Sequence, residues 1–202
     1  MTRTQDVLLD ILNPVRDIYL SRILEEMSAA LDRDFVCKTD MPRRTHGGEM
    51  LRSGALNLPE RYDLYTEHNG HPRAFDVEDG LQVRFDPVFT RLKNGAPVSI
   101  SPFRWNALPI YVVVGDQGTD WQPVRHWFLE AFQPRFEDDT PEFHGVIHRC
   151  HGPVAKGSGW TFEVDLGSAP VDCLTDLLTA LDACHATKVS LGTVTTSATD
   201  DA

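Results

Sequence analysis

Residues 143–166 read FHGVIHRCHGPVAKGSGWTFEVDL and hold three of the eight histidines and one of the four cysteines of the chain. Two largely apolar segments, 143–150 and 160–166, flank a glycine-rich connection, which is typical of two antiparallel strands. Gly145, Gly152 and Pro153 disfavour a helix across the stretch. The stretch therefore predicts a strand hairpin that leads into the last helix of the chain.

Strand geometry decides which of these side chains can meet. His144, His148 and Cys150 share one face of a straight strand, but His144 and His148 lie about 13 Å apart at ~3.3 Å per residue. His148 and Cys150 are close enough to converge on one ion, and His185 from elsewhere in the chain would complete a zinc site. The alternative is a half-buried sheet face with a hydrogen-bonded His148 and no cofactor.

No catalytic motif surrounds this candidate site. The sequence contains no H-E-x-x-H, no C-x-x-C pair, no G-x-S-x-G nucleophile elbow and no dinucleotide fingerprint. The connection GPVAKGSG lacks the lysine of a phosphate-binding loop and leads into a strand, where a phosphate site needs a helix N-terminus. A thiolate at Cys150 with a histidine base needs surroundings that lower the thiol pKa, and no helix is predicted to start there.

The N-terminal half predicts a helix followed by a meander of strands. Residues 14–32 repeat apolar side chains at spacings of three and four, and Asn13-Pro14 is a typical helix start. Asn69-Gly70 favours a type I′ turn, so 62–68 and 71–77 are predicted to form a hairpin that pairs His68 with His71. Further strands are predicted at 81–85, 88–92, 97–100 and 110–114.

The C-terminal half adds two helices and a last strand. Asp120 is placed to cap a helix with Pro123 in its first turn, and Ser168 to cap another with Pro170 in its first turn. A final strand is predicted at 188–194. The order of elements predicts an α+β fold, in which a mostly antiparallel sheet, made of the meander and the C-terminal strand hairpin, is covered by three main helices. Residues 1–194 are expected to form a single domain, followed by a disordered polar tail at 195–202.

The charge of the chain restricts its partners. Formal net charge is −11, and residues 101–202 alone carry 6 Lys and Arg against 14 Asp and Glu. An acidic surface repels phosphate backbones and anionic lipids, so we expect no nucleic acid and no membrane partner. A basic protein is the favoured partner, and the acidic residues of one loop are the predicted contacts: Glu137, Asp138, Asp139 and Glu142. The alternative is that the charge serves solubility alone.

The sequence also leads to expectations about the cellular compartment and the function of the protein. No apolar run is long enough to span a bilayer or to serve as a signal peptide, and four irregularly spaced cysteines make no disulfide framework, so we expect a cytoplasmic protein with free thiols. The first hypothesis is a non-enzymatic binding protein without a cofactor. It would capture or neutralise a basic protein, as an inhibitor, an immunity protein or a chaperone-like factor does. The alternative is a small metal-dependent hydrolase with zinc at His148, Cys150 and one further ligand.

Overall fold

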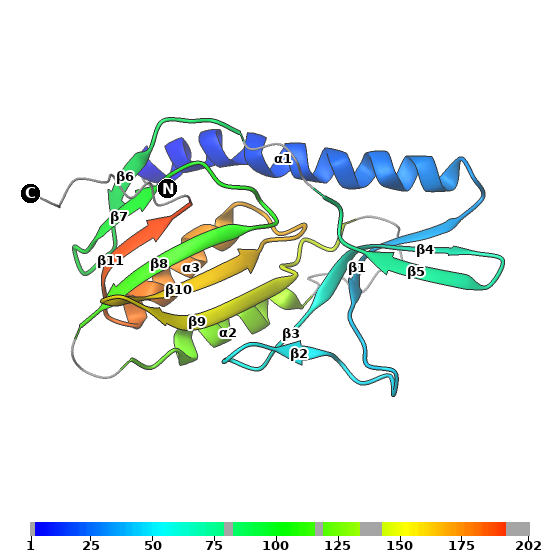
Figure 1. The fold of residues 1–202 in the computed structure, drawn as a ribbon. Coiled ribbons are helices and arrows are strands. Elements are labelled where there is room, and N and C mark those ends of the chain that lie inside the picture. The colour runs from blue at the N-terminus through cyan, green and yellow to red at the C-terminus, as the bar shows by residue number, and fades with distance from the viewer. Residues whose placement is uncertain (1–2, 79–82, 116–118, 134–142, 193–202) are drawn as a thin grey trace, which may run out of the picture.

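A six-stranded sheet forms the body of the protein (Figure 1). The computed structural model describes residues 3–78, 83–115, 119–133 and 143–192. The strand order is β6-β7-β11-β8-β10-β9, and neighbours run antiparallel except β7 and β11. The strands are β6 (Val88–Arg91), β7 (Pro97–Ile100), β8 (Leu108–Val114), β9 (Arg149–Lys156), β10 (Gly159–Asp165) and β11 (Ala186–Leu191).

A smaller sheet stands beside this body, in the order β1-β4-β5. Its strands are β1 (Val36–Pro42), β4 (Arg61–His68) and β5 (His71–Phe75), and the short strands β2 (Arg52–Ser53) and β3 (Leu58–Pro59) form a separate pair. The predicted hairpin is confirmed, because Asn69 and Gly70 both have positive φ angles, 51° and 77°, and His68 pairs with His71. These angles are those that a type I′ turn requires.

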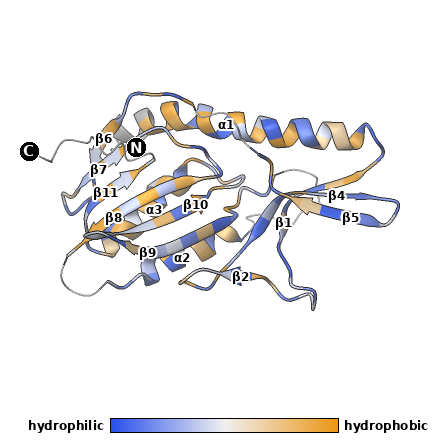
Figure 2. Ribbon diagram, viewed as in Figure 1, coloured by the Kyte–Doolittle hydropathy of each residue, from blue (hydrophilic) through white to orange (hydrophobic). Residues whose placement is uncertain are grey.

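Three helices pack on the sheets within the described residues: α1 (Arg3–Leu31), α2 (Gln122–Phe132) and α3 (Asp172–Ala183). In Figure 1, α2 and α3 lie behind the six-stranded sheet, whereas α1 runs along its edge and reaches the small sheet. Figure 2 shows apolar residues gathered along β8 and the first half of α1. The α+β fold with mostly antiparallel sheets and three helices is therefore confirmed.

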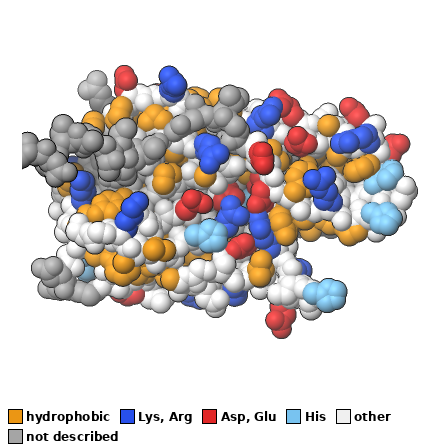
Figure 3. All heavy atoms as spheres, viewed as in Figure 1, with side chains coloured by type: hydrophobic (Ala, Val, Ile, Leu, Met, Phe, Trp, Pro, Cys, Tyr) orange, Lys and Arg blue, Asp and Glu red, His pale blue; other side chains and the backbone are white. Residues whose placement is uncertain are grey.

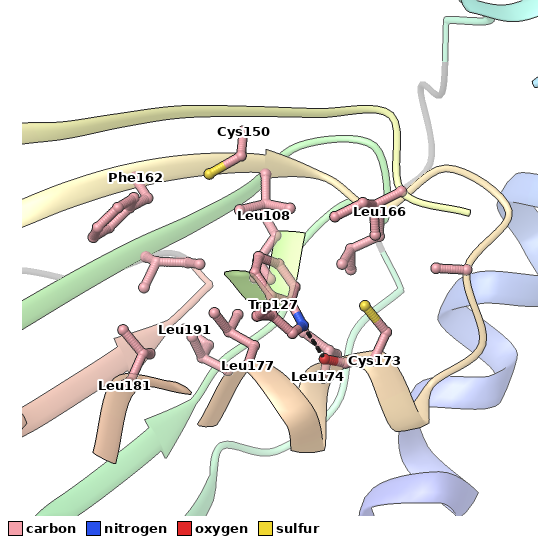
Figure 4. Packing of buried hydrophobic residues seen from close by; sticks show 14 of the residues in the cluster. Leu108, Trp127, Cys150, Phe162, Leu166, Cys173, Leu174, Leu177, Leu181 and Leu191 are labelled. Atoms are coloured by element: carbon pink, nitrogen blue, oxygen red, sulfur yellow. Dashed lines mark hydrogen bonds between the residues drawn. The ribbon is translucent and has the colours of Figure 1, made fainter. Parts of the chain in front are cut away.

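The core lies between the large sheet and the helices behind it (Figure 4). Leu174, Leu177 and Leu181 of α3 are buried against the strands, and the Trp127 ring of α2 donates a hydrogen bond from Nε1 to the Cys173 carbonyl at 3.0 Å. Along β8, Ile110 and Val112 are buried. Their neighbours Tyr111 and Val113 are only half-buried, so one face of β8 is packed in the core and the other is partly exposed. No described helix covers the second face.

The first helix begins eleven residues earlier than expected, at Arg3, so Pro14 lies inside it. Proline removes one helical hydrogen bond, the one to the carbonyl four residues earlier. Pro14 and Asp10 are both exposed, so water can solvate the carbonyl of Asp10. None of the described helices is long and apolar enough to cross a membrane.

The C-terminal hairpin is shifted relative to the prediction. Strand β9 covers most of the glycine-rich connection, the turn falls at Gly157-Ser158, and residues 143–148 are not in a strand. Helix α3 starts at Asp172, and Ser168 does not cap it, because its hydroxyl binds elsewhere. The predicted acidic contacts Glu137, Asp138, Asp139 and Glu142, the tail at 195–202 and part of the strand at 81–85 lie outside the described residues.

Candidate functional site

His148 lies completely buried between two carboxylates at the junction of the two sheets. Its Nε2 is 2.6 Å from Oδ1 of Asp40, and its Nδ1 is 2.8 Å from Oδ1 of Asp63. A neutral imidazole donates through only one nitrogen, so the two contacts together favour the doubly protonated ring. Burial alone would lower the pKa of His148, but the hydrogen bonds to Asp40 and Asp63 raise it to about 10.

The two carboxylates come from neighbouring strands of the small sheet. Thr39 pairs with Leu64 and Met41 with Tyr62, so the register places Asp40 of β1 opposite Asp63 of β4. Like charges directly opposite each other destabilise a sheet, and the imidazolium between them offsets this repulsion. Asp40 also has a φ angle of 53°, a left-handed conformation that Asp tolerates better than most residues.

Every oxygen of these two carboxylates accepts a hydrogen bond. Oδ2 of Asp40 accepts from the Ser168 hydroxyl at 2.9 Å and from the His144 backbone N–H at 2.7 Å. Oδ1 of Asp63 also accepts from the Tyr19 hydroxyl at 2.5 Å, and its Oδ2 accepts from the backbone N–H of Val77. Burial would raise the pKa of Asp40, but the hydrogen bond from His148 is the main cause that lowers it.

Asp165 is a third buried carboxylate beside His148. Its backbone carbonyl accepts the backbone N–H of His148 at 3.0 Å, its Oδ1 accepts the backbone N–H of Gly167, and its Oδ2 lies 3.7 Å from the Arg149 guanidinium. Burial raises the pKa of Asp165 to about 7, although the charge of His148 opposes the shift. The site therefore contains one carboxyl group whose pKa is raised towards neutral pH by burial.

A glycine packs against the imidazole, and an arginine binds the backbone of Asp40. A Cβ on Gly167, which has a φ angle of +52°, would lie 2.3 Å from Cδ2 of His148, so no larger residue fits there. The Arg61 guanidinium donates to the Asp40 carbonyl at 2.5 Å and to the Phe132 carbonyl at 3.1 Å, and it stacks over the Phe132 ring. Burial lowers the pKa of Arg61, and the charge of Asp40 opposes that shift.

Among the described residues, one group of potential metal ligands lies close enough to hold an ion together: Asp63, His148 and Asp165. One potential ligand atom from each lies within 4.8 Å of the others. Both imidazole nitrogens already face carboxylate oxygens, and the nearby Arg61 and Arg149 supply positive charge. These side chains thus form a hydrogen-bonded ion network that joins the small sheet to the large one.

The predicted zinc ligands are not brought together with His148. Cys150 lies in the apolar core beside Leu108 and Phe162 (Figure 4), and burial raises the pKa of its thiol to about 12. His185 is exposed at the turn between α3 and β11. The strand begins only at Arg149, so His148 and Cys150 do not share the strand face on which the prediction rested.

Sequence reasoning missed Tyr19, Asp40, Asp63 and Asp165. A signal was present: each of the three aspartates occurs in a β-forming context, as Thr-Asp-Met, Tyr-Asp-Leu and Val-Asp-Leu. Aspartate is depleted in strands, so an aspartate at such a position indicates a buried partner. The comparisons with known proteins supply no further information, because no family model, no curated protein and no solved structure matches this chain.

Proposed function

We propose that this protein is a non-enzymatic, cytoplasmic binding protein that captures a basic protein partner, as an inhibitor, an immunity protein or a chaperone-like factor does. One observation carries the proposal. His148, the imidazole at the centre of this site, has 0% of its surface exposed, and both ring nitrogens are held by carboxylates. A general acid or base must come within hydrogen-bonding reach of a substrate, and this imidazole does not.

The net charge of −11 supports the choice of partner. Complementary charge accelerates association over long range, and salt screens it within about 10 Å at 0.1 M. The mechanism is therefore electrostatic capture of a basic surface, with Glu137, Asp138, Asp139 and Glu142 as the proposed contacts. Capture of this kind is fast at low salt and slower at high salt.

The test needs the partner in purified form. The full chain, immobilised, is used to isolate partners that are then identified, and the association rate constant of the purified pair is measured at low and at high ionic strength. We expect the association rate constant to decrease by about tenfold or more as salt rises.

The variant E137Q/D138N/D139N/E142Q should lower the association rate constant at low salt. The control E25Q/E26Q/D32N/D34N removes the same charge from exposed positions of α1 and the turn after it. A rate that responds to neither salt nor the first variant overturns electrostatic capture.

The close approach of Asp63, His148 and Asp165 favours a second candidate, a metal-dependent hydrolase. Imidazole and carboxylate ligands suit zinc, and this set replaces the predicted one of His148, Cys150 and His185. Elemental analysis of the purified protein separates the two functions. About one metal ion per chain, lost in His148→Ala, would support the hydrolase. A substoichiometric content that His148→Ala leaves unchanged would remove it.

A further inference from the structure

A hollow of about 870 Å³ lies on the large sheet, over β6, β7 and β11. Its lining includes Phe89, Arg91, Ser99 and Lys188, and no residue of the His148 network belongs to it. Figure 3 shows basic and hydrophobic side chains next to one another over β11 and β8 at this end of the sheet, whereas the nearest acidic side chains lie towards the small sheet.

The pairing of the strands explains the hollow. Phe89 pairs with Ser99, and Ser99 pairs with Ser190. Ser190 in turn pairs with Tyr111. Directly opposed residues share a face of the sheet, and the neighbours of Tyr111 along β8 are buried in the core, so this row lies on the face away from α2 and α3. The two serines in the middle are small, so the surface is low between the two aromatic rings.

Phe89 offers an aromatic surface at the edge of the hollow. It is 77% exposed, more than any other large hydrophobic residue that the structure describes. An aromatic ring of a ligand that packs on it removes apolar surface of both rings from water.

Two cations lie in the next row of the same face. Arg91 follows Phe89 by two residues and pairs with Pro97, and Lys188 precedes Ser190 by two residues. Side chains two residues apart in a strand point to the same side. Arg91 and Lys188 are therefore two strand spacings apart, or about 10 Å between Cα atoms, and their long side chains can reach one anion between them.

Neither cation has a carboxylate partner among the described residues. Arg91 donates to the Gly95 carbonyl at 2.7 Å, and Lys188 forms no hydrogen bond or ion pair with a described residue. They are the charged residues of the described lining, although the whole chain has 30 Asp and Glu against 19 Lys and Arg. Salt screens charges beyond about 10 Å at 0.1 M, so the two nearby cations set the sign of the potential in the hollow.

We propose that this hollow binds a small aromatic anion, a planar ring that carries a carboxylate, sulfonate or phosphate group. The ring lies against Phe89. The anionic group lies between Arg91, which donates hydrogen bonds, and Lys188, which adds a second positive charge. The inference goes beyond the proposed function and does not depend on it, because a basic hollow repels a basic partner.

The hollow is tested with a small probe on the full chain. Proton–nitrogen correlation spectra of the labelled protein are recorded during titration with benzenesulfonate and, in parallel, with benzenesulfonamide, which keeps the ring and carries no charge at neutral pH. We expect saturable shifts for benzenesulfonate, largest at the amides of β6, β7 and β11, and at least about fivefold weaker binding of benzenesulfonamide. Equal affinity for the two compounds, shifts confined to other elements, or no saturable shift overturns the inference.

A matched pair of variants tests the two cations. Arg91→Gln combined with Lys188→Gln should weaken benzenesulfonate binding by about fivefold or more. The control is Arg44→Gln combined with Lys38→Gln, which should leave the affinity unchanged. Arg44 also donates to the carbonyl four residues later, Lys38 is also an exposed strand lysine, and neither lines the hollow. All four residues are exposed, so both variants are expected to fold. An equal effect of the two variants overturns the inference.

A second pair of variants tests the aromatic contact. Phe89→Ala should weaken benzenesulfonate binding by about fivefold or more, because the ring of the ligand loses its partner. Val36→Ala, at a position that is 57% exposed on the small sheet, should leave the affinity unchanged. Unchanged affinity in Phe89→Ala would overturn the proposed class of ligand.

Discussion

Nε2 of His148 lies 2.6 Å from Oδ1 of Asp40, and both side chains are at most 1% exposed. The opposite ring nitrogen faces Asp63, so one buried cation joins two carboxylates that stand opposite each other in β1 and β4. Removing one member of a buried, paired set leaves an uncompensated charge. We therefore expect the attachment of the small sheet to depend on His148.

His148→Ala should lower the free energy of unfolding by about 3 to 5 kcal/mol, because Asp40 and Asp63 would then face each other without a cation. Urea denaturation followed by circular dichroism measures this change. His151→Ala, at an exposed position three residues further on, is the control and should change the stability by less than about 0.5 kcal/mol. Equal effects of the two substitutions would contradict the role given to the ion network.

The stability of the protein should fall as pH rises across the neutral range. The pKa of His148 is raised from 6.5 to about 10, so its contribution is complete below pH 6.5 and is lost as pH rises towards 10. The pKa of Asp165 is raised from 3.8 to about 7, so the folded state keeps a proton that the unfolded chain releases, and stability falls between these values too. Asp40 acts in the opposite sense, since its lowered pKa favours the folded state above pH 3.8.

Asp165→Asn separates these contributions. The amide oxygen can still accept the Gly167 N–H but does not titrate. Unfolding measured as a function of pH should show a flatter profile for this variant between pH 3.8 and 7, with the decline towards pH 10 retained. A wild-type profile that rises steadily from pH 4 to 7 would contradict the assignment to Asp165.

Gly167→Ala should be far more destabilising than Gly157→Ala. Both glycines have similar positive φ angles, +52° and +59°, so each substitution carries the same backbone cost of about 1 kcal/mol. Only at Gly167 would the new Cβ meet the His148 ring, at 2.3 Å, whereas nothing lies within 4 Å of it at Gly157. Thermal unfolding of the two variants compares them directly, and equal melting temperatures would show that the ring is not packed as described.

Cys150 should be inert towards thiol reagents in the folded protein. Its sulfur is buried, and the pKa of the thiol is about 12, so the reactive thiolate is scarce at neutral pH. Mass spectrometry after timed alkylation should find Cys150 modified only when the chain is unfolded in guanidinium chloride. Modification in the native state at the rate of the unfolded chain would revive a nucleophilic or metal-binding role for this residue.

Local sequence determined much of the fold. The Asn69-Gly70 turn, the strand at Pro97–Ile100 and the presence of α2 and α3 could be predicted, because each depends on residues within a few positions of one another. A helix was predicted correctly at α1, but its start was predicted at Pro14 and lies at Arg3. A proline at an exposed position does not end a helix that is held by packing. The last hairpin is shifted because strand pairing, and not the local sequence, decides which residues form its strands. In this hairpin β9 pairs with β10, and β10 pairs with β8.

The site itself was decided only by the tertiary structure. His148 was singled out from the sequence, but its partners Asp40 and Asp63 lie 108 and 85 residues away. Tyr19 reaches Asp63 across 44 residues. No local sequence pattern indicates that residues so far apart along the chain are in contact. What the sequence carried was the indication that aspartates among strand-forming residues need buried partners, and only the packing of the small sheet against the large one showed that His148 satisfies two of them.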